Sequence, residues 1–208
     1  MKYKFLILLA LSVHLVGCSK KTELKYTIAS DPIIKTLEIP NTTVELSELH
    51  YNKQTSRWTL NDQLFSGHAV SFYQDSILKE KINLLNGKKQ NQSTIWYPDG
   101  HFKQVAMYHK GKLHGEKKKW TSDSSHILIS HLHYYLGKAH GEQKIWYPTG
   151  ELYKKLQLKM GKEEGIQKAY RKNGALYSNY EAKEGRIFGL KKAALCFGLD
   201  DETIQYEN

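Results

Sequence analysis

The chain has 208 residues and carries 31 lysines and arginines against 21 aspartates and glutamates, a formal net charge of +10. This length suffices for one elongated domain, and the positive charge favours anionic partners such as lipid headgroups, lipopolysaccharide phosphates or an acidic protein. The sequence has no serine in a strand-to-helix elbow, no cysteine beside a positioned base and no glycine-rich loop that opens a helix, so we expect neither an enzyme nor a cofactor.

Residues 1–17 have the pattern of a bacterial export signal. Lys2 and Lys4 precede a mostly apolar run that is too short to remain as a transmembrane helix. The run ends in Leu-Val-Gly-Cys, which resembles the lipobox of bacterial lipoproteins. This resemblance implies cleavage before Cys18 and acylation of its thiol and amine, so that the protein is anchored to a membrane through lipid. The alternative is an ordinary secretory signal with an incidental cysteine.

The residue after the cysteine bears on location. It is Ser19 and not aspartate, which implies the outer membrane by the usual sorting rule. No acidic run follows, which favours the periplasmic face, with the cell surface as the alternative. Nucleic acid does not fit this compartment, and no nucleic-acid-binding module is visible in the sequence.

Residues 18–66 precede the repetitive part of the chain. Residues 18–42 are polar, rich in lysine and contain two prolines, which predicts a lipid anchor and a tether of limited structure. Residues 43–66 predict a divergent capping hairpin, in which Val44 leads to a turn near 52–55 and Trp58 follows. An atypical first unit is expected in a repeat array because it must cap an open end.

Residues 67–188 contain five copies of one pattern. The residues that open successive units lie 24 or 26 positions apart, and a large aromatic residue stands five positions after each of them. Fixed periods of this size are typical of repeat architectures. The opening glycines are Gly67, Gly115, Gly141 and Gly165, with Asn91 in the second unit and Gly189 starting an incomplete sixth; the aromatic residues, here called the ring row, are Phe72, Trp96, Trp120, Trp146 and Tyr170.

Each unit has the residue pattern of a β-hairpin. In the fourth unit, residues 143–147 favour a strand, Pro148-Thr149-Gly150 favours a turn, and residues 152–158 alternate between apolar and polar. A single hairpin is marginal in water, so neighbouring units must pair. The prediction is an all-β fold, an elongated single-layer antiparallel sheet of tandem hairpins with the ring row as its core. The alternative for the rings is a platform that binds carbohydrate.

Three segments carry a resemblance to a known family. The sequences NGKKQ (86–90), KGKLHGEKKKW (110–120) and GKAHGEQKIWYPTGELYKKL (137–156) resemble the variant MORN repeat of bacterial proteins, and the resemblance extends over about residues 61–188. The resemblance implies tandem hairpins; many bacterial members are labelled as the antitoxin component of a toxin–antitoxin system, and other MORN proteins are associated with membranes, lipids or scaffolding. The chain departs from the pattern at Asn91 and at residues 123–125, where an insertion predicts a longer third hairpin loop.

Residues 189–208 begin as a sixth unit and then lose the pattern. We expect a partial repeat, a closing cap and a loose tail. With Cys18 lipidated, Cys196 has no partner for an internal disulfide. It is expected to be a buried small apolar residue, with pairing between molecules or metal binding as alternatives.

The polar face offers candidate binding residues. Equivalent positions of a repeat align across the sheet, so Lys118, Lys144 and Lys168 are expected to form a row. Such a row suits a phospholipid or an acidic partner, and the alternative is a solvated face tolerated through salt screening. A second row, Tyr73, Tyr97 and Tyr147, is expected to be half-exposed and to suit a stacked ligand.

Histidines offer a possible metal site. His131 and His133 share one face of a predicted strand, opposite Leu132. They are expected either to face solvent without a ligand or to start a zinc or copper site, with His126 or His109 as the third ligand. His114 and His140 precede opening glycines and are expected to belong to the repeat framework.

These observations support three hypotheses about function. The first is a membrane-anchored, non-catalytic binding or scaffold module for a protein or an anionic envelope component. The second, which rests on the resemblance, is an antitoxin or immunity protein that neutralises a toxin. The third is a metal-binding protein or enzyme of the envelope that uses His131, His133 and Cys196.

Overall fold

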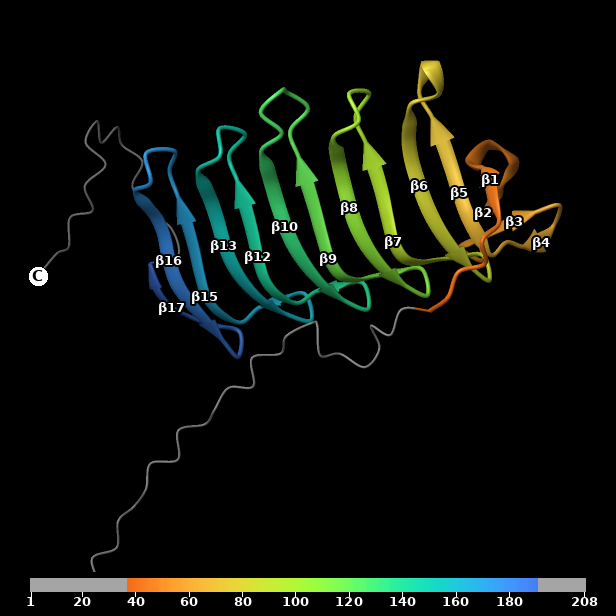
Figure 1. Ribbon diagram of the computed structural model, residues 1–208. Helices are drawn as coiled ribbons and strands as arrows, with labels where there is room; N and C mark the ends of the chain where they lie inside the picture. Colours follow the sequence, from red (N-terminus) through yellow and green to blue (C-terminus); the bar gives the residue numbers. More distant parts are fainter. Residues whose placement is uncertain (1–36, 191–208) are drawn as a thin grey trace, which may run out of the picture.

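The computed structural model describes residues 37–190 and consists almost entirely of β-strands (Figure 1). Twelve strands follow one another in a 14-stranded sheet, and three short strands form a second sheet at its N-terminal end. No helix in the described range is long and apolar enough to cross a membrane. The strands of the main path are β1 (Thr43–Glu45), β5 (Gly67–Phe72), β6 (Leu78–Leu85), β7 (Lys88–Trp96), β8 (Phe102–His109), β9 (Lys112–Trp120), β10 (Leu128–Tyr135), β12 (Gly141–Trp146), β13 (Leu152–Lys159), β15 (Gly165–Tyr170), β16 (Leu176–Lys183) and β17 (Arg186–Leu190).

The predicted fold class is confirmed. From β5 to β17 every strand pairs antiparallel with the next, and the five repeats form the hairpins β5–β6, β7–β8, β9–β10, β12–β13 and β15–β16. The sheet is a long meander that does not close on itself (Figure 1). Two short strands, β11 (Lys138–Ala139) and β14 (Lys162–Glu163), extend the links that lead into the fourth and fifth hairpins.

Two kinds of turn alternate along the meander. Two-residue turns join one hairpin to the next; in Met160-Gly161, for example, φ is 52° and 86°, the paired positive values of a type I′ turn. The hairpin tips are five-residue loops such as 97–101, in which only Gly100 has positive φ. The tight two-residue turn therefore lies at the link between hairpins and not at the hairpin tip. The third tip, 121–127, has seven residues, which confirms the predicted longer loop.

The N-terminal cap differs from the predicted single hairpin. Strand β1, which contains Val44, pairs parallel with β5 and extends the main sheet. The turn at 53–56 instead joins β2 (His50–Asn52) to β3 (Arg57–Leu60), which also pairs with β4 (Gln63–Leu64). Two 3-10 turns complete the described elements, η3 (Leu46–Glu48) and η4 (Gln74–Ser76). The difference arises because the free edge of β5 offers unpaired backbone groups that β1 satisfies.

The largest apolar cluster lies where this cap meets the first hairpin. Leu49 and Phe65 of the cap region pack with Ala69, Ile82 and Leu84 of β5 and β6. Opening glycine Gly67 is needed at this contact because a Cβ atom there would lie 2.4 Å from the carbonyl oxygen of Thr42. The cap thus covers one end of one face of the main sheet.

The pairing register assigns the remaining residues to two faces. One face, on which the cap packs, carries Ala69 and Ile82 and continues through Ala106 to Gln143 and Gln167; the side chains of these five residues are buried. The opposite face, here called the charged face, carries Lys118, His131, Lys144, Lys155 and Lys168.

The prediction that the ring row forms the core is wrong. Phe72 is 45% exposed, and the other four rings are only half-buried. Trp146 stands two residues after Lys144 in β12, so alternation places it on the charged face. At each hairpin tip the register shifts, so that the ring-row residue is paired with the first residue of the following strand, as Trp96 is with Phe102. The ring of Phe102 also lies 5.8 Å from that of Trp120 between centroids. The capping sheet packs on the other face, so it does not cover the rings.

The predicted lipidation site Cys18, the predicted export signal, most of the predicted tether, Cys196 and the predicted C-terminal tail lie outside the described residues.

Candidate functional site

A row of cations crosses the charged face at right angles to the strands. Lys118 of β9 is paired with His131 of β10, which is paired in turn with Lys144 of β12. Lys144 is paired with Lys155 of β13, and Lys155 with Lys168 of β15. The structure thus brings together the three predicted lysines and adds Lys155. The prediction missed Lys155 because it compared only the first strands of the hairpins, whereas Lys155 lies in the second strand of the fourth hairpin. We call Lys118, Lys144, Lys155 and Lys168 the lysine row.

Two glutamates neutralise part of the lysine row. Glu116 and Glu142 stand two residues before Lys118 and Lys144 on the same face, and each carboxylate lies 2.6 Å from the ammonium group of that lysine. Lys155 also contacts Glu142, at 3.0 Å. The fifth repeat carries Ile166 where the third and fourth repeats carry these glutamates. Lys168 therefore has no glutamate beside it in its own strand, and Glu181 of β16 is paired with Ile166 instead.

The C-terminal end of the row is hollowed. Lys155, Lys168 and Tyr170 line a depression of about 730 Å³ together with Ile166, which is 54% exposed. Lys183 and the carboxylates of Glu164 and Glu181 also line it. A ring-row residue and two cations of the lysine row therefore share one concave surface. This arrangement combines an apolar flat group with charged donors, as sites for amphipathic anions require.

The row of tyrosines has a structural role. The hydroxyl groups of Tyr73, Tyr97 and Tyr147 donate hydrogen bonds of 2.9 to 3.0 Å to backbone carbonyl groups of the next repeat. A lysine ammonium group lies over each ring, 5.5 to 5.8 Å from its centroid. Their half-buried state is as predicted, but the hydroxyl group and one ring face are already in use, so these residues are poor candidates for stacking a ligand.

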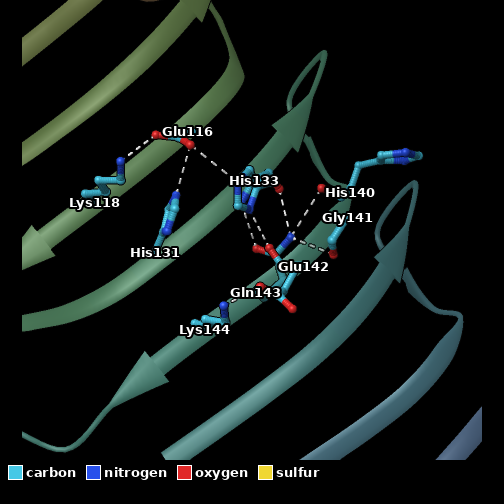
Figure 2. Close-up of polar contacts among 9 residues, drawn as sticks. All are labelled: Glu116, Lys118, His131, His133, His140, Gly141, Glu142, Gln143 and Lys144. Carbon is cyan, nitrogen blue, oxygen red and sulfur yellow. Dashed lines mark hydrogen bonds and ion pairs between the residues drawn. The ribbon is translucent and has the colours of Figure 1, made fainter. Parts of the chain in front are cut away.

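The histidine pair lies beside the lysine row (Figure 2). His133 is directly opposite Glu116 in the β9–β10 register, and its Nε2 lies 3.7 Å from Glu116 Oε1. The Nε2 of His131 lies 3.2 Å from the same oxygen, and the two imidazole centroids are 4.5 Å apart. The prediction of His126 or His109 as the third potential ligand was wrong, because the group that lies beside both imidazoles is the carboxylate of Glu116. The signal that was missed is Glu116 itself, two residues before Lys118 in one strand.

Hydrogen bonds hold one imidazole in place. His133 Nδ1 lies 2.6 Å from the backbone carbonyl oxygen of Glu142, so Nδ1 donates to that oxygen and Nε2 points toward Glu116. The buried amide of Gln143 accepts from the backbone N–H of His133 at 3.1 Å and donates to its carbonyl at 2.9 Å (Figure 2). The backbone of β10 is therefore fixed from the neighbouring strand at this point.

The charges of this cluster follow from its surroundings. Burial acts to raise the pKa of Glu116, but hydrogen bonding from Lys118 and the positive charges of His131 and Lys118 outweigh it, so the pKa is lower than usual. The pKa of His131 is also lowered, chiefly by burial and against the attraction of Glu116. The two directions favour an ionised Glu116 and a neutral His131, the forms in which these two groups act as ligands.

The other histidines have different neighbours. His126 lies in the third tip loop, where its ring stacks on that of His101 at 3.4 Å between centroids and its Nε2 lies 3.7 Å from Asp99. His114 and His140 accept the backbone N–H groups of Leu136 and Met160 at 3.2 and 3.3 Å, which agrees with their predicted framework role. Gln90 occupies the same repeat position and accepts from Lys110.

Neither a scan against models of protein families nor a search of curated proteins returned a match. The resemblance to variant MORN repeats stays a prediction.

Proposed function

We propose that this protein is a non-catalytic, membrane-anchored module of the bacterial envelope that binds phosphate-bearing lipid on its charged face. The observation that supports the proposal best is the lysine row, which crosses β9 to β15 in unbroken cross-strand register. Its lipid anchor and its location are those expected from residues 1–19.

The charge arrangement favours an anionic ligand. Neighbouring strands lie about 4.8 Å apart, so the aligned lysines of this face repel one another unless negative charge lies over them. Glu116 and Glu142 supply part of that charge, whereas the strand of Lys168 carries Ile166 at the matching position and the carboxylate opposite Ile166, that of Glu181, belongs to the next strand. A ligand with spaced phosphate groups would supply the rest, and an amphipathic one would also contact the half-exposed rings of the ring row.

Purified full-length protein in neutral detergent provides the test. Micelles of that detergent containing phosphatidylglycerol are compared with micelles containing phosphatidylcholine, and binding is followed by tryptophan fluorescence because Trp120 and Trp146 border the lysine row. The binding variant is K118Q/K144Q/K168Q. The matched control is K112Q/K138Q/K162Q, which removes three exposed lysines that also recur once per repeat but lie at the links.

We expect selective binding to phosphatidylglycerol and about tenfold weaker binding by K118Q/K144Q/K168Q, since exposed charge contacts contribute roughly 0.2–1 kcal/mol each. Binding should also weaken as salt is raised. Equal losses in both triple variants would mean that net charge alone is responsible. If the protein bound neither kind of micelle, and crosslinking in the envelope recovered one specific protein, the charged face would instead be assigned to a protein partner.

A further inference from the structure

The cluster of Glu116, His131 and His133 presents three potential metal-ligand atoms on one half-buried patch. One potential ligand atom from each of the three residues lies within 4.8 Å of the other two. The side chains of His131 and His133 are 23% and 19% exposed, so the patch is sheltered but open to solvent. Figure 2 shows the three side chains projecting from β9 and β10 toward one another.

The distances fit a small divalent cation. Zinc binds imidazole nitrogen and carboxylate oxygen at roughly 2.0–2.2 Å, so tetrahedral ligand atoms are about 3.3 Å apart. Glu116 Oε1 lies 3.2 Å from His131 Nε2 and 3.7 Å from His133 Nε2. Both distances are close to the spacing that a tetrahedral ion requires of its ligands.

Neighbouring groups orient the side chains of this cluster, as they orient the ligands of metal sites. His133 Nδ1 donates to the carbonyl oxygen of Glu142, which directs Nε2 toward the other two groups. Lys118 binds Glu116 Oε2, while Oε1 is the oxygen that faces both histidines. The Nε2 of His131 is buried and makes no hydrogen bond of good geometry within the described range. An ion would satisfy that atom.

The repeat supplies an internal comparison. In the fourth hairpin, Glu142 and Lys144 occupy the positions of Glu116 and Lys118 and form the same ion pair at 2.6 Å. The strand that faces them, β13, has Lys155 and Gln157 where β10 has His131 and His133. The glutamate–lysine pair is thus a feature of the repeat, whereas the two histidines belong to the third hairpin.

We propose that Glu116, His131 and His133 form a binding site for one Zn²⁺ ion or a similar divalent transition-metal ion. Two imidazole nitrogens and one carboxylate oxygen suit such ions, and three protein ligands leave a coordination position open for water or an exogenous ligand. This site goes beyond lipid binding by the lysine row and does not depend on it.

The test is a metal titration of untagged full-length protein in neutral detergent, stripped with a chelator and dialysed. Zn²⁺ affinity is measured by competition with a chromophoric chelator, and the visible spectrum of Co²⁺ reports its coordination. We expect one equivalent of Zn²⁺, a rise in the thermal unfolding midpoint, and a Co²⁺ spectrum typical of nitrogen and oxygen ligands. The affinity should fall at least about tenfold in E116Q and in H131A/H133A.

Two controls locate the site. E142Q removes the equivalent glutamate of the next repeat but keeps its backbone carbonyl, so its affinity should match that of the unchanged protein. H101A/H126A removes the histidines beside Asp99, the other group of three possible ligands in the described range, and should also bind normally. No stoichiometric binding by the unchanged protein would overturn the proposal, as would full binding by H131A/H133A or loss of binding only in H101A/H126A. Thermal unfolding of each metal-free variant shows whether it is folded.

Discussion

The hydroxyl group of Tyr97 donates a hydrogen bond of 3.0 Å to the backbone carbonyl of Trp120, 23 residues further along the chain. Tyr73 and Tyr147 make the same bond to Trp96 and Tyr170. These bonds join one repeat to the next at the tip end, where the backbone pairing between hairpins ends. Neighbour contacts of this kind carry the stability of a repeat array.

Removing one such hydroxyl should weaken the array. Tyr97→Phe keeps the ring and leaves a carbonyl without its donor, so we expect the free energy of unfolding to fall by about 0.5–1.5 kcal/mol. Urea unfolding followed by tryptophan fluorescence measures the change. Tyr51→Phe, in a ring that is 40% exposed in the cap, is the matched control. Equal midpoints for Tyr97→Phe and the unchanged protein would show that the inter-repeat bond adds no stability.

Buried glutamines replace missing backbone pairing. The side-chain amide of Gln167 accepts from the backbone N–H of Gln157 at 3.2 Å and donates to its carbonyl at 2.7 Å. It is fully buried, and the β13–β15 register has only two residue pairs, Lys154 with Ala169 and Lys155 with Lys168. The amide thus continues the hydrogen bonding after the two strands separate.

Gln167→Leu should therefore cost about 1–3 kcal/mol, because it leaves the N–H of Gln157 unsatisfied in a buried place. Gln157→Leu makes the same chemical change on the charged face and should have a much smaller effect. Denaturant unfolding of both variants gives the comparison. If the two variants were equally stable, the bridging role of Gln167 would be wrong.

Tyr180 links stability to alkaline pH. Its hydroxyl donates to the Glu163 carboxylate at 2.8 Å, and burial followed by this hydrogen bond raises its pKa from 10.0 to about 12. The fold favours the neutral phenol, so the resulting stability is complete below pH 10 and is lost as the pH rises through about 12.

Tyr180→Phe should accordingly remove part of the loss of stability between pH 10 and 12. Glu163→Gln should lower the pKa of Tyr180 toward 10.0 without restoring it fully, because burial is the larger cause. Titration of tyrosinate absorbance detects both changes. An unchanged late-titrating tyrosine in Tyr180→Phe would assign the raised pKa to another residue.

Asn91 replaces an opening glycine for a reason that the structure reveals. Its φ is 59°, a left-handed value that asparagine tolerates, and its amide nitrogen donates to the carbonyl of Leu37 at 2.7 Å. The side chain thereby holds the segment before β1 against the second hairpin. A glycine would keep the backbone conformation but not this contact.

Asn91→Gly should thus change the free energy of unfolding little while increasing amide hydrogen exchange in residues 37–42. Asn91→Ala should lose the contact and also strain the backbone by about 1–2 kcal/mol. Hydrogen exchange and urea unfolding separate the two effects. Slow exchange of residues 37–42 in both variants would contradict the role of the Asn91 amide.

Much of the candidate site was within reach of the sequence. Lys118, Lys144 and Lys168 follow from the repeat period, and the shared face of His131 and His133 follows from their spacing of two residues. The same spacing between Lys144 and Trp146 already places a ring beside the lysines, against the prediction of a sealed aromatic core. Burial was misjudged because a ring in every repeat is compatible with either face of a single-layer sheet.

By itself the sequence determined the hairpins, their number, the longer third loop and the alternation of polar and apolar faces, because strand preference, turn glycines and period-two patterns are properties of neighbouring residues. The tertiary structure alone decided that Glu116 lies opposite His133, that Lys155 completes the lysine row and that β1 joins the main sheet. Those outcomes depend on the register between strands and on which edge remains free. Register is set by backbone hydrogen bonds and bulges that join residues far apart in the chain.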